Sequence, residues 1–270
     1  MTTHESSFLE MKDWFDKNTE GNVLVALSGG VDSAVVALAA KHVLQDNAVA
    51  MTANYQTLAE SEMITAINVA KEIGIRHKVI HYNELDEPDF SKNDRFRCYY
   101  CRKSLSRYLI SYAKEMGISC IVDGTNADDV FDFRPGIKAL HESGIKSPLL
   151  EKKIGKSVIR QIARHYKLSI YNKPSNSCLA SRIPHGITIT QQKLRKIEYA
   201  ENIIKDLFQV EQVRVRDHND IARIEIDIKE FPKMFDLKKL NTADISLKKI
   251  GFRYVSLDLG GYKSGKLVVL

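Results

Sequence analysis

The sequence predicts an α/β fold in which helices cover both faces of a mainly parallel sheet, followed by a small α+β domain. In the first half of the chain, short apolar runs alternate with longer segments of helical periodicity, which is typical of stacked βαβ units. Beyond Thr190 the pattern becomes a long amphipathic helix and then short stretches in which apolar and charged residues alternate. We therefore expect one domain over residues 1–185 and a second over residues 186–270.

The first domain is expected to begin with an amphipathic segment around Trp14 and Phe15. Ligands of open parallel sheets bind at the carboxyl ends of the strands, and residues 28–33, 53–55 and 124–126 fall at such ends. The expected elements are strands at 22–27, 48–54, 77–82 and 119–123, and helices at 33–45, 58–73, 102–116 and 156–166.

The second domain follows an irregular segment at 175–186. Its strands are predicted by period-two alternation, in which apolar residues share one face and charged residues the other. The expected elements are a helix from 190 to about 208, strands at 213–216 and 224–228, a helix at 231–240 and a strand at 252–258.

Charge and hydropathy narrow the class of protein. The 270 residues carry a formal net charge of +6, with a pI near 9.0, which suits an enzyme of polyanionic substrates and equally a protein that touches RNA. Lys and Arg are dispersed along amphipathic helices, so we expect most of them on solvated faces. No apolar run approaches the roughly 20 residues of a membrane span, and we expect a cytoplasmic protein that does not bind a membrane.

The loop Ser28-Gly29-Gly30-Val31-Asp32-Ser33 joins a predicted buried strand to the start of a predicted helix. Glycines let the backbone approach an oxyanion closely, and the first turn of a helix offers N–H donors and a positive dipole end. The loop has neither the lysine of a Walker loop nor the spacing of a dinucleotide fingerprint. We therefore predict a phosphate-binding loop of another kind.

Three of the four cysteines are arranged as metal or cluster ligands would be. Cys98 and Cys101 form a C-x-x-C pair that opens a helix, Cys178 lies in the irregular segment, and Cys120 is expected in the core. In a reducing cytosol such a pair indicates metal, cluster or redox chemistry. Zinc would take His185 as its fourth ligand, whereas three thiolates suit a 4Fe-4S cluster with one open iron that could carry an extra sulfide. We favour the cluster.

The loop resembles that of the PP-loop ATP pyrophosphatases, and several segments together resemble the LarE family of pyridinium-3,5-biscarboxylic acid mononucleotide sulfurtransferases. The resemblance covers almost the whole chain in the family's order. The matching segments are 28–33, 97–102, 124–129, 132–136, 173–184 and 213–216.

Two kinds of member are implied by this resemblance. One kind gives up the sulfur of a single cysteine, at the position of Cys178, and becomes dehydroalanine. In the other kind Cys98 and Cys101 join Cys178 to hold a 4Fe-4S cluster, whose extra sulfide is a donor for repeated turnover. The C-x-x-C pair indicates that this chain is of the second kind, with Cys178 as the catalytic cysteine in either case.

The resemblance also implies an adenylation with ATP and Mg²⁺, after which sulfur displaces AMP and a thiocarboxylate results. Asp32 either caps its helix or holds magnesium. Residues 124–126 form the facing wall of the nucleotide site or a plain turn. The residues expected to bind the nucleotide are Ser28, Gly29, Gly30, Asp32 and Ser33, which would cradle pyrophosphate, and Gly124, Thr125 and Asn126.

A mononucleotide phosphate is expected to bind Arg214 and Arg216, which spacing places on one side of a strand. A solvated strand face is the alternative. Arg182 and Arg134 are plausible anion ligands, and Glu201 holds magnesium or substrate unless it lies on a surface helix. The expected partners are this small molecule, a sulfide source that the motifs leave unspecified, and further copies of the chain, six by family resemblance.

A PP-loop enzyme that thiolates tRNA is the rival function, because it also combines adenylation with C-x-x-C cysteines. No appended RNA-binding module is evident, and paired arginines suit one phosphate better than a long backbone. An amidotransfer-type ligase would explain the loop without the cysteines, and a non-enzymatic iron–sulfur carrier would explain the cysteines without the loop. Nucleic acid is therefore the less favoured partner.

Overall fold

The computed structural model describes residues 2–131, 135–174 and 176–263. Two compact units are present: an N-terminal unit of residues 2–90 and 96–176, and a C-terminal unit of residues 91–95 and 177–263. The assignment of separate ATP-binding and substrate-binding domains at 1–185 and 186–270 stays a prediction. In the described parts of the chain, no helix has both the length and the apolar character that a membrane crossing requires.

The N-terminal unit contains a parallel four-stranded sheet in the order β3-β2-β1-β4, which confirms the α/β fold predicted from the sequence. Val25 of β1 pairs with Ala50 of β2 on one side and Val122 of β4 on the other. The strands are β1 (Val23–Ala26), β2 (Ala48–Asn54), β3 (Arg76–His81) and β4 (Ile121–Val122).

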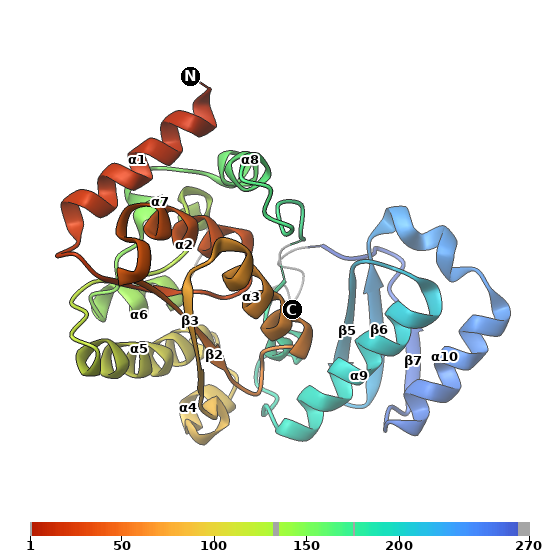
Figure 1. Cartoon of the computed structure of the whole chain (residues 1–270). Coiled ribbons are helices and arrows are strands. Elements are labelled where there is room, and N and C mark those ends of the chain that lie inside the picture. The colour runs from red at the N-terminus through yellow and green to blue at the C-terminus, as the bar shows by residue number, and fades with distance from the viewer. Residues whose placement is uncertain (1, 132–134, 175, 264–270) are drawn as a thin grey trace. The chain divides into compact units, whose positions relative to one another are not determined.

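Helices cover both faces of this sheet, as expected (Figure 1). Val23 and Val25 of β1 pack with α1, α2, α3 and α8, whereas Leu24 points to the other face and packs with α5 and α6. The helices are α1 (Thr3–Asn18), α2 (Val31–Leu44), α3 (Glu60–Ile73), α4 (Pro88–Ser91), α5 (Arg97–Glu115), α6 (Pro135–Glu142), α7 (Pro148–Glu151) and α8 (Lys156–His165).

Helix α5 begins at Arg97, which confirms that the C-x-x-C pair opens a helix, whereas the predicted bounds of 102–116 begin too late. Its N-cap residue, Phe96, offers no side-chain cap, so no local signal marks this end of the helix. Packing against α6 stabilises it instead: a Cβ added at Gly136 would lie only 3.3 Å from the carbonyl oxygen of Cys98. The C-x-x-C pair therefore lies in the first turn of α5.

The C-terminal unit has a sheet in the order β5-β6-β7, in which β5 and β6 are antiparallel and β6 and β7 are parallel. Val213, Val215, Ile224 and Ile226 turn one face of it toward α9 and α10, where the core of the unit lies. The elements are α9 (Gln191–Phe208), β5 (Val213–His218), β6 (Ile221–Ile226), α10 (Leu237–Lys249) and β7 (Tyr254–Leu257).

The helix predicted at 231–240 is wrong in its bounds. Residues Ile228–Met234 form a 3-10 helix that contains Pro232, and α10 begins only at Leu237. The carboxylate of Asp236 accepts hydrogen bonds from the N–H groups of Lys238 and Lys239, so it is the N-cap that fixes the start of α10.

Candidate functional site

The phosphate loop, residues 28–33, follows β1 and enters α2 in the way that an anion seat requires. Gly29 has a φ of +78°, and an added Cβ would lie 2.9 Å from the carbonyl oxygen of Glu62, so a side chain is excluded twice over. Gly30 is the N-cap of α2 and provides no side-chain cap. The Ser33 hydroxyl donates to the Gly30 carbonyl and accepts from the Ser28 N–H, which holds the loop closed.

Asp32 lies in the first turn of α2 but does not cap the helix, so that alternative is wrong. One oxygen, Oδ2, accepts a hydrogen bond from Nζ of Lys156, whereas Oδ1 is buried and has no hydrogen-bond partner among the described residues. Burial raises the pKa of the Asp32 carboxyl, and Lys156 offsets that shift only in part. A buried oxygen without a partner suits a ligand of a hard cation such as Mg²⁺.

The 124–126 turn lies directly against the phosphate loop. A Cβ added at Gly124 would be 2.6 Å from the Ser33 backbone nitrogen. Asp123 fixes the turn by accepting hydrogen bonds from the N–H and hydroxyl of Thr125, at 3.2 and 2.5 Å. Asn126 accepts from the Asp128 N–H at 2.9 Å. The turn and the loop thus form two adjacent walls of the N-terminal unit, both at the carboxyl edge of the sheet.

Replacing Gly124 by Ala is expected to lower the free energy of unfolding by about 1–3 kcal/mol, because backbone must move to admit the methyl group. Urea denaturation followed by circular dichroism measures this. Gly30→Ala is the matched control, since its Cβ would meet only the Ser28 hydroxyl, at 3.4 Å. Equal stability of the two variants would contradict the close approach.

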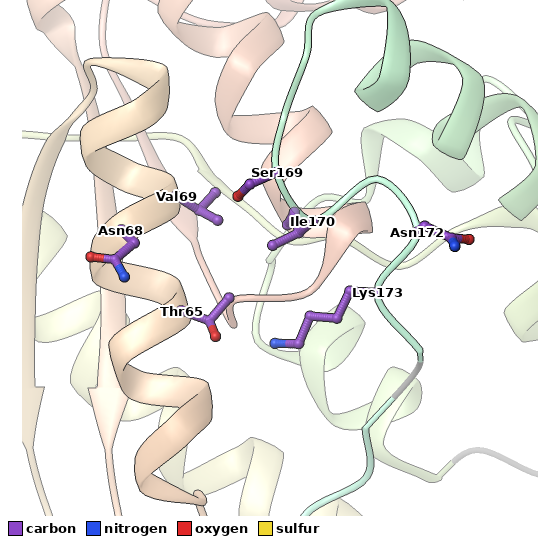
Figure 2. A pocket seen from close by; sticks show the side chains of 7 residues that line it. All are labelled: Thr65, Asn68, Val69, Ser169, Ile170, Asn172 and Lys173. Atoms are coloured by element: carbon purple, nitrogen blue, oxygen red, sulfur yellow. The ribbon is translucent and has the colours of Figure 1, made fainter. Parts of the chain in front are cut away.

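Three basic side chains near the loop were missed in the sequence analysis: Lys156 and Arg160 of α8, and Lys173. Lys156 reaches Asp32, and Nζ of Lys173 donates to the Gly29 carbonyl at 3.2 Å. Lys173 lines a pocket of about 350 Å³ between α3 and residues 169–173, and Figure 2 shows its side chain among those that line this pocket. The Lys173-Pro174 pair within the matching segment 173–184 was the one signal that could have found the second lysine.

The cysteines of the C-x-x-C pair lie on one face of α5, since positions three apart are neighbours on a helix. Cys98 is exposed and Cys101 is half-buried, so both thiols offer a donor set for a soft metal or cluster. Cys120 is buried in the core as expected, and burial raises its pKa. In the C-terminal unit Cys178 is half-buried, and Nδ1 of His185 lies 3.2 Å from the Asn93 carbonyl oxygen.

Arg182 is fully buried and forms a two-point ion pair with Glu201 of α9, with N–O distances of 2.8 and 3.0 Å. The surface-helix alternative for Glu201 is therefore wrong, because this residue is only 5% exposed. Arg182 also donates to the backbone carbonyls of Ser177 and Cys178. The pair thus fixes the backbone on which Cys178 lies.

Arg214 and Arg216 share the face of β5 opposite to the core, but they are 4% and 5% exposed, so the solvated-face alternative is wrong. Arg216 pairs with Glu225 of β6 and donates to the Ser181 carbonyl at 2.6 Å. The Arg214 guanidinium lies 5.2 Å from the centre of the Tyr262 ring, and burial lowers its pKa. Arg134 lies outside the described residues.

Comparison of the sequence with known proteins identifies a family and several relatives. A family model described as asparagine synthase matches residues 18–207. An uncharacterised protein of Synechocystis is 41% identical over 244 residues, which is 90% of this chain and 91% of that protein. The pyridinium-3,5-bisthiocarboxylic acid mononucleotide synthase of Lactiplantibacillus plantarum is 35% identical over 91% of this chain and 88% of its own. An uncharacterised protein of Methanocaldococcus jannaschii is 31% identical over 92% and 94%.

Proposed function

Because the chain belongs to the asparagine synthase-like PP-loop enzymes that use ATP, and within them to the LarE family of sulfurtransferases, we propose that it makes a thiocarboxylate of a pyridinium mononucleotide. The substrate is pyridinium-3,5-biscarboxylic acid mononucleotide. The proposal is carried by the 35% identity, over 91% of this chain, to a synthase whose name states the bisthiocarboxylic product. The phosphate loop and the accessible thiols are the chemical parts that such a synthesis needs.

In the first step a carboxylate oxygen of the substrate attacks the α-phosphorus of ATP. An oxygen–phosphorus bond forms, the bond to pyrophosphate breaks, and pyrophosphate leaves. Negative charge grows on the leaving oxygens, so donors fixed in advance stabilise the transition state. Ser28, Ser33 and the start of α2 hold the pyrophosphate, and the 124–126 turn contacts the nucleoside. Mg²⁺ bound at Asp32 would neutralise part of the phosphate charge.

In the second step sulfur attacks the acyl carbon, the carbon–sulfur bond forms, and AMP leaves with the electron pair of the carbon–oxygen bond. A 4Fe-4S cluster held by Cys98, Cys101 and Cys178 would supply the sulfide. Arg182 and Glu201 hold the backbone of Cys178 in place. Arg214 and Arg216 are the proposed ligands of the substrate phosphate, and their burial strengthens a charge-assisted contact.

The test is an anaerobic assay with the full chain, ATP, Mg²⁺, sulfide and the biscarboxylated mononucleotide. We expect AMP, pyrophosphate and a product in which sulfur replaces carboxylate oxygen, measured by mass spectrometry. A tRNA fraction is the parallel substrate. Thiolated tRNA together with an unchanged mononucleotide would overturn the proposal in favour of a tRNA-thiolating enzyme.

Cys98→Ala is expected to abolish the iron–sulfur absorption of the anaerobic protein and to limit product to at most one molecule per chain, because the added sulfide then has no cluster to deliver it and Cys178 can give up its own sulfur once. Cys120→Ser is the control, because this cysteine is buried in the core of the N-terminal unit. Metal analysis accompanies the assay. Zinc without iron, or more than one product per chain from Cys98→Ala, would contradict the role given to the cluster.

A further inference from the structure

The phosphate loop carries no basic residue, although its proposed guest is a polyphosphate. A Walker loop contains a lysine that reaches the β- and γ-phosphates, whereas residues 28–33 contain one acidic residue, Asp32. Backbone donors and a helix dipole alone leave most of the charge of pyrophosphate unbalanced. Mg²⁺ at Asp32 would balance part of that charge, and basic side chains elsewhere in the N-terminal unit can balance more of it.

Lys156 is one source of that charge. It is the first residue of α8, after the N-cap Gly155, and its backbone N–H donates to Oδ2 of Asp128 at 2.6 Å. Asp128 lies two residues after Asn126, and its N–H donates to the side chain of Asn126, so the lysine is anchored to the wall of the site. Its side chain is 30% exposed and ends at Oδ2 of Asp32, on the first turn of α2. An incoming anion can therefore reach this ammonium group.

Lys173 brings a second charge to the other end of the loop. Its Nζ lies 3.2 Å from the Gly29 carbonyl oxygen and 2.7 Å from Oε2 of Glu62, and its side chain is 21% exposed. Figure 2 shows this side chain extending from the 169–173 segment toward α3. The lysine is half-buried and ion-paired in the same manner as Lys156.

Arg160 connects the two lysines, because it lies on the same helix as Lys156 and binds the backbone of Lys173. It lies one turn after Lys156 on α8, and its two terminal nitrogens donate to the carbonyls of Tyr171 and Lys173 at 3.0 and 2.8 Å. The helix that carries the first lysine thus clamps the backbone of the second. Arg160 is a positioning residue for Lys173.

We propose that Lys156 and Lys173 bind the pyrophosphate part of ATP, and that they do so by exchanging their carboxylate partners, Asp32 and Glu62, for phosphate oxygens. This inference rests on the proposed ATP-dependent function. A lysine is a compact charge with rotatable donors, which suits a leaving group whose charge grows as its bond to the α-phosphorus breaks. In the structure the two carboxylates hold the ammonium groups beside the loop.

The test is a calorimetric titration of the full chain with inorganic pyrophosphate and Mg²⁺. Lys156→Met and Lys173→Met are each expected to weaken binding about tenfold or more, because each removes a charge-assisted contact, while AMP affinity changes less than about twofold. Lys41→Met is the matched control: Lys41 lies near the opposite end of α2, is half-buried like Lys173, and pairs with Asp46 at 2.9 Å.

A purely structural role of these ion pairs gives a different result, and Glu62→Gln separates the two. If Lys173 only ties segments together, Glu62→Gln weakens pyrophosphate binding as much as Lys173→Met does. If Lys173 is a phosphate ligand, Glu62→Gln keeps or raises the affinity, because the lysine loses its competitor. Glu62→Gln keeps Lys173, so it tests the proposal even if Lys173→Met does not fold.

Unchanged pyrophosphate affinity in both lysine variants, or a wild-type chain that does not bind pyrophosphate, would overturn the inference. The titration contains neither the pyridinium substrate nor sulfide. A failed thiocarboxylate assay beside a successful titration would therefore refute the proposed substrate alone, and the reverse result would refute the role of the lysines alone.

Discussion

Arg182→Met lowers the free energy of unfolding by about 3–5 kcal/mol, because it leaves Glu201 buried without its cation. The arginine is fully buried and also binds the carbonyls of Ser177 and Cys178, which lose their donor in the same variant. Glu201 keeps the hydrogen bond from the N–H of Val215 at 3.1 Å and the attraction of the Arg214 charge. Neither replaces the two charge-assisted hydrogen bonds that Arg182 donates to this buried carboxylate.

Urea denaturation of the full chain measures this loss, with Arg195→Met as the control, because Arg195 is an exposed residue of the same helix as Glu201. The double variant Arg182→Met/Glu201→Leu is expected to recover part of the stability, since it removes both charges. A loss below about 1 kcal/mol in the single variant would show that water or another group compensates the carboxylate. Sulfur transfer should fall together with stability, because the same arginine holds the backbone of Cys178.

The local parts of the site could be predicted from the sequence. The phosphate loop and the 124–126 turn each follow a buried strand, and the carboxyl ends of parallel strands meet at one edge of a sheet. Periodicity and glycine positions carry that information within a few residues. The C-x-x-C pair is correctly predicted to open a helix, but the predicted bounds of that helix begin at 102, because packing on α6 and not a capping residue fixes the first residue of α5.

The partners of the charged side chains around the site could not be predicted from the sequence. Lys156 and Lys173 lie 124 and 144 positions from their partners Asp32 and Gly29, so no local pattern pairs them. The alternation of valine and arginine in β5 has the form of a half-solvated strand. Arg216 is buried nevertheless, because Glu225 on the neighbouring strand supplies the compensating charge.

Asp32→Asn is expected to lower the rate of adenylation by about a hundredfold or more, because the amide is a poor ligand for Mg²⁺ and the proposed metal contact is lost. The same substitution is expected to leave the free energy of unfolding at neutral pH unchanged or to raise it. Burial raises the pKa of this carboxyl, with Lys156 opposing the shift only in part, so the ionised form is disfavoured in the folded chain.

The pH dependence follows from the direction of that shift. Below the unfolded-state pKa of about 3.9, the carboxyl is protonated in both the folded and the unfolded chain and costs no stability. As the pH rises through the folded-state pKa, the buried carboxyl must ionise and the folded chain loses stability. The advantage of Asp32→Asn over the wild type should therefore be absent in acid and complete at neutral pH. Asp46→Asn is the control, because the pKa of that exposed carboxyl is lowered by Lys41 and the sign is reversed.

Measured together, the two effects separate a functional carboxylate from a structural one. If Asp32 has only a structural role, Asp32→Asn makes the chain less stable, because the ion pair with Lys156 is lost. Activity then falls only in proportion to the fraction of folded protein. A carboxylate that serves to bind a metal costs stability until the metal binds, and it is retained for that function. An Asp32→Asn variant that is both less stable and fully active would refute the second interpretation. A variant that is at least as stable and nearly inactive would show that burial of this charge serves the reaction.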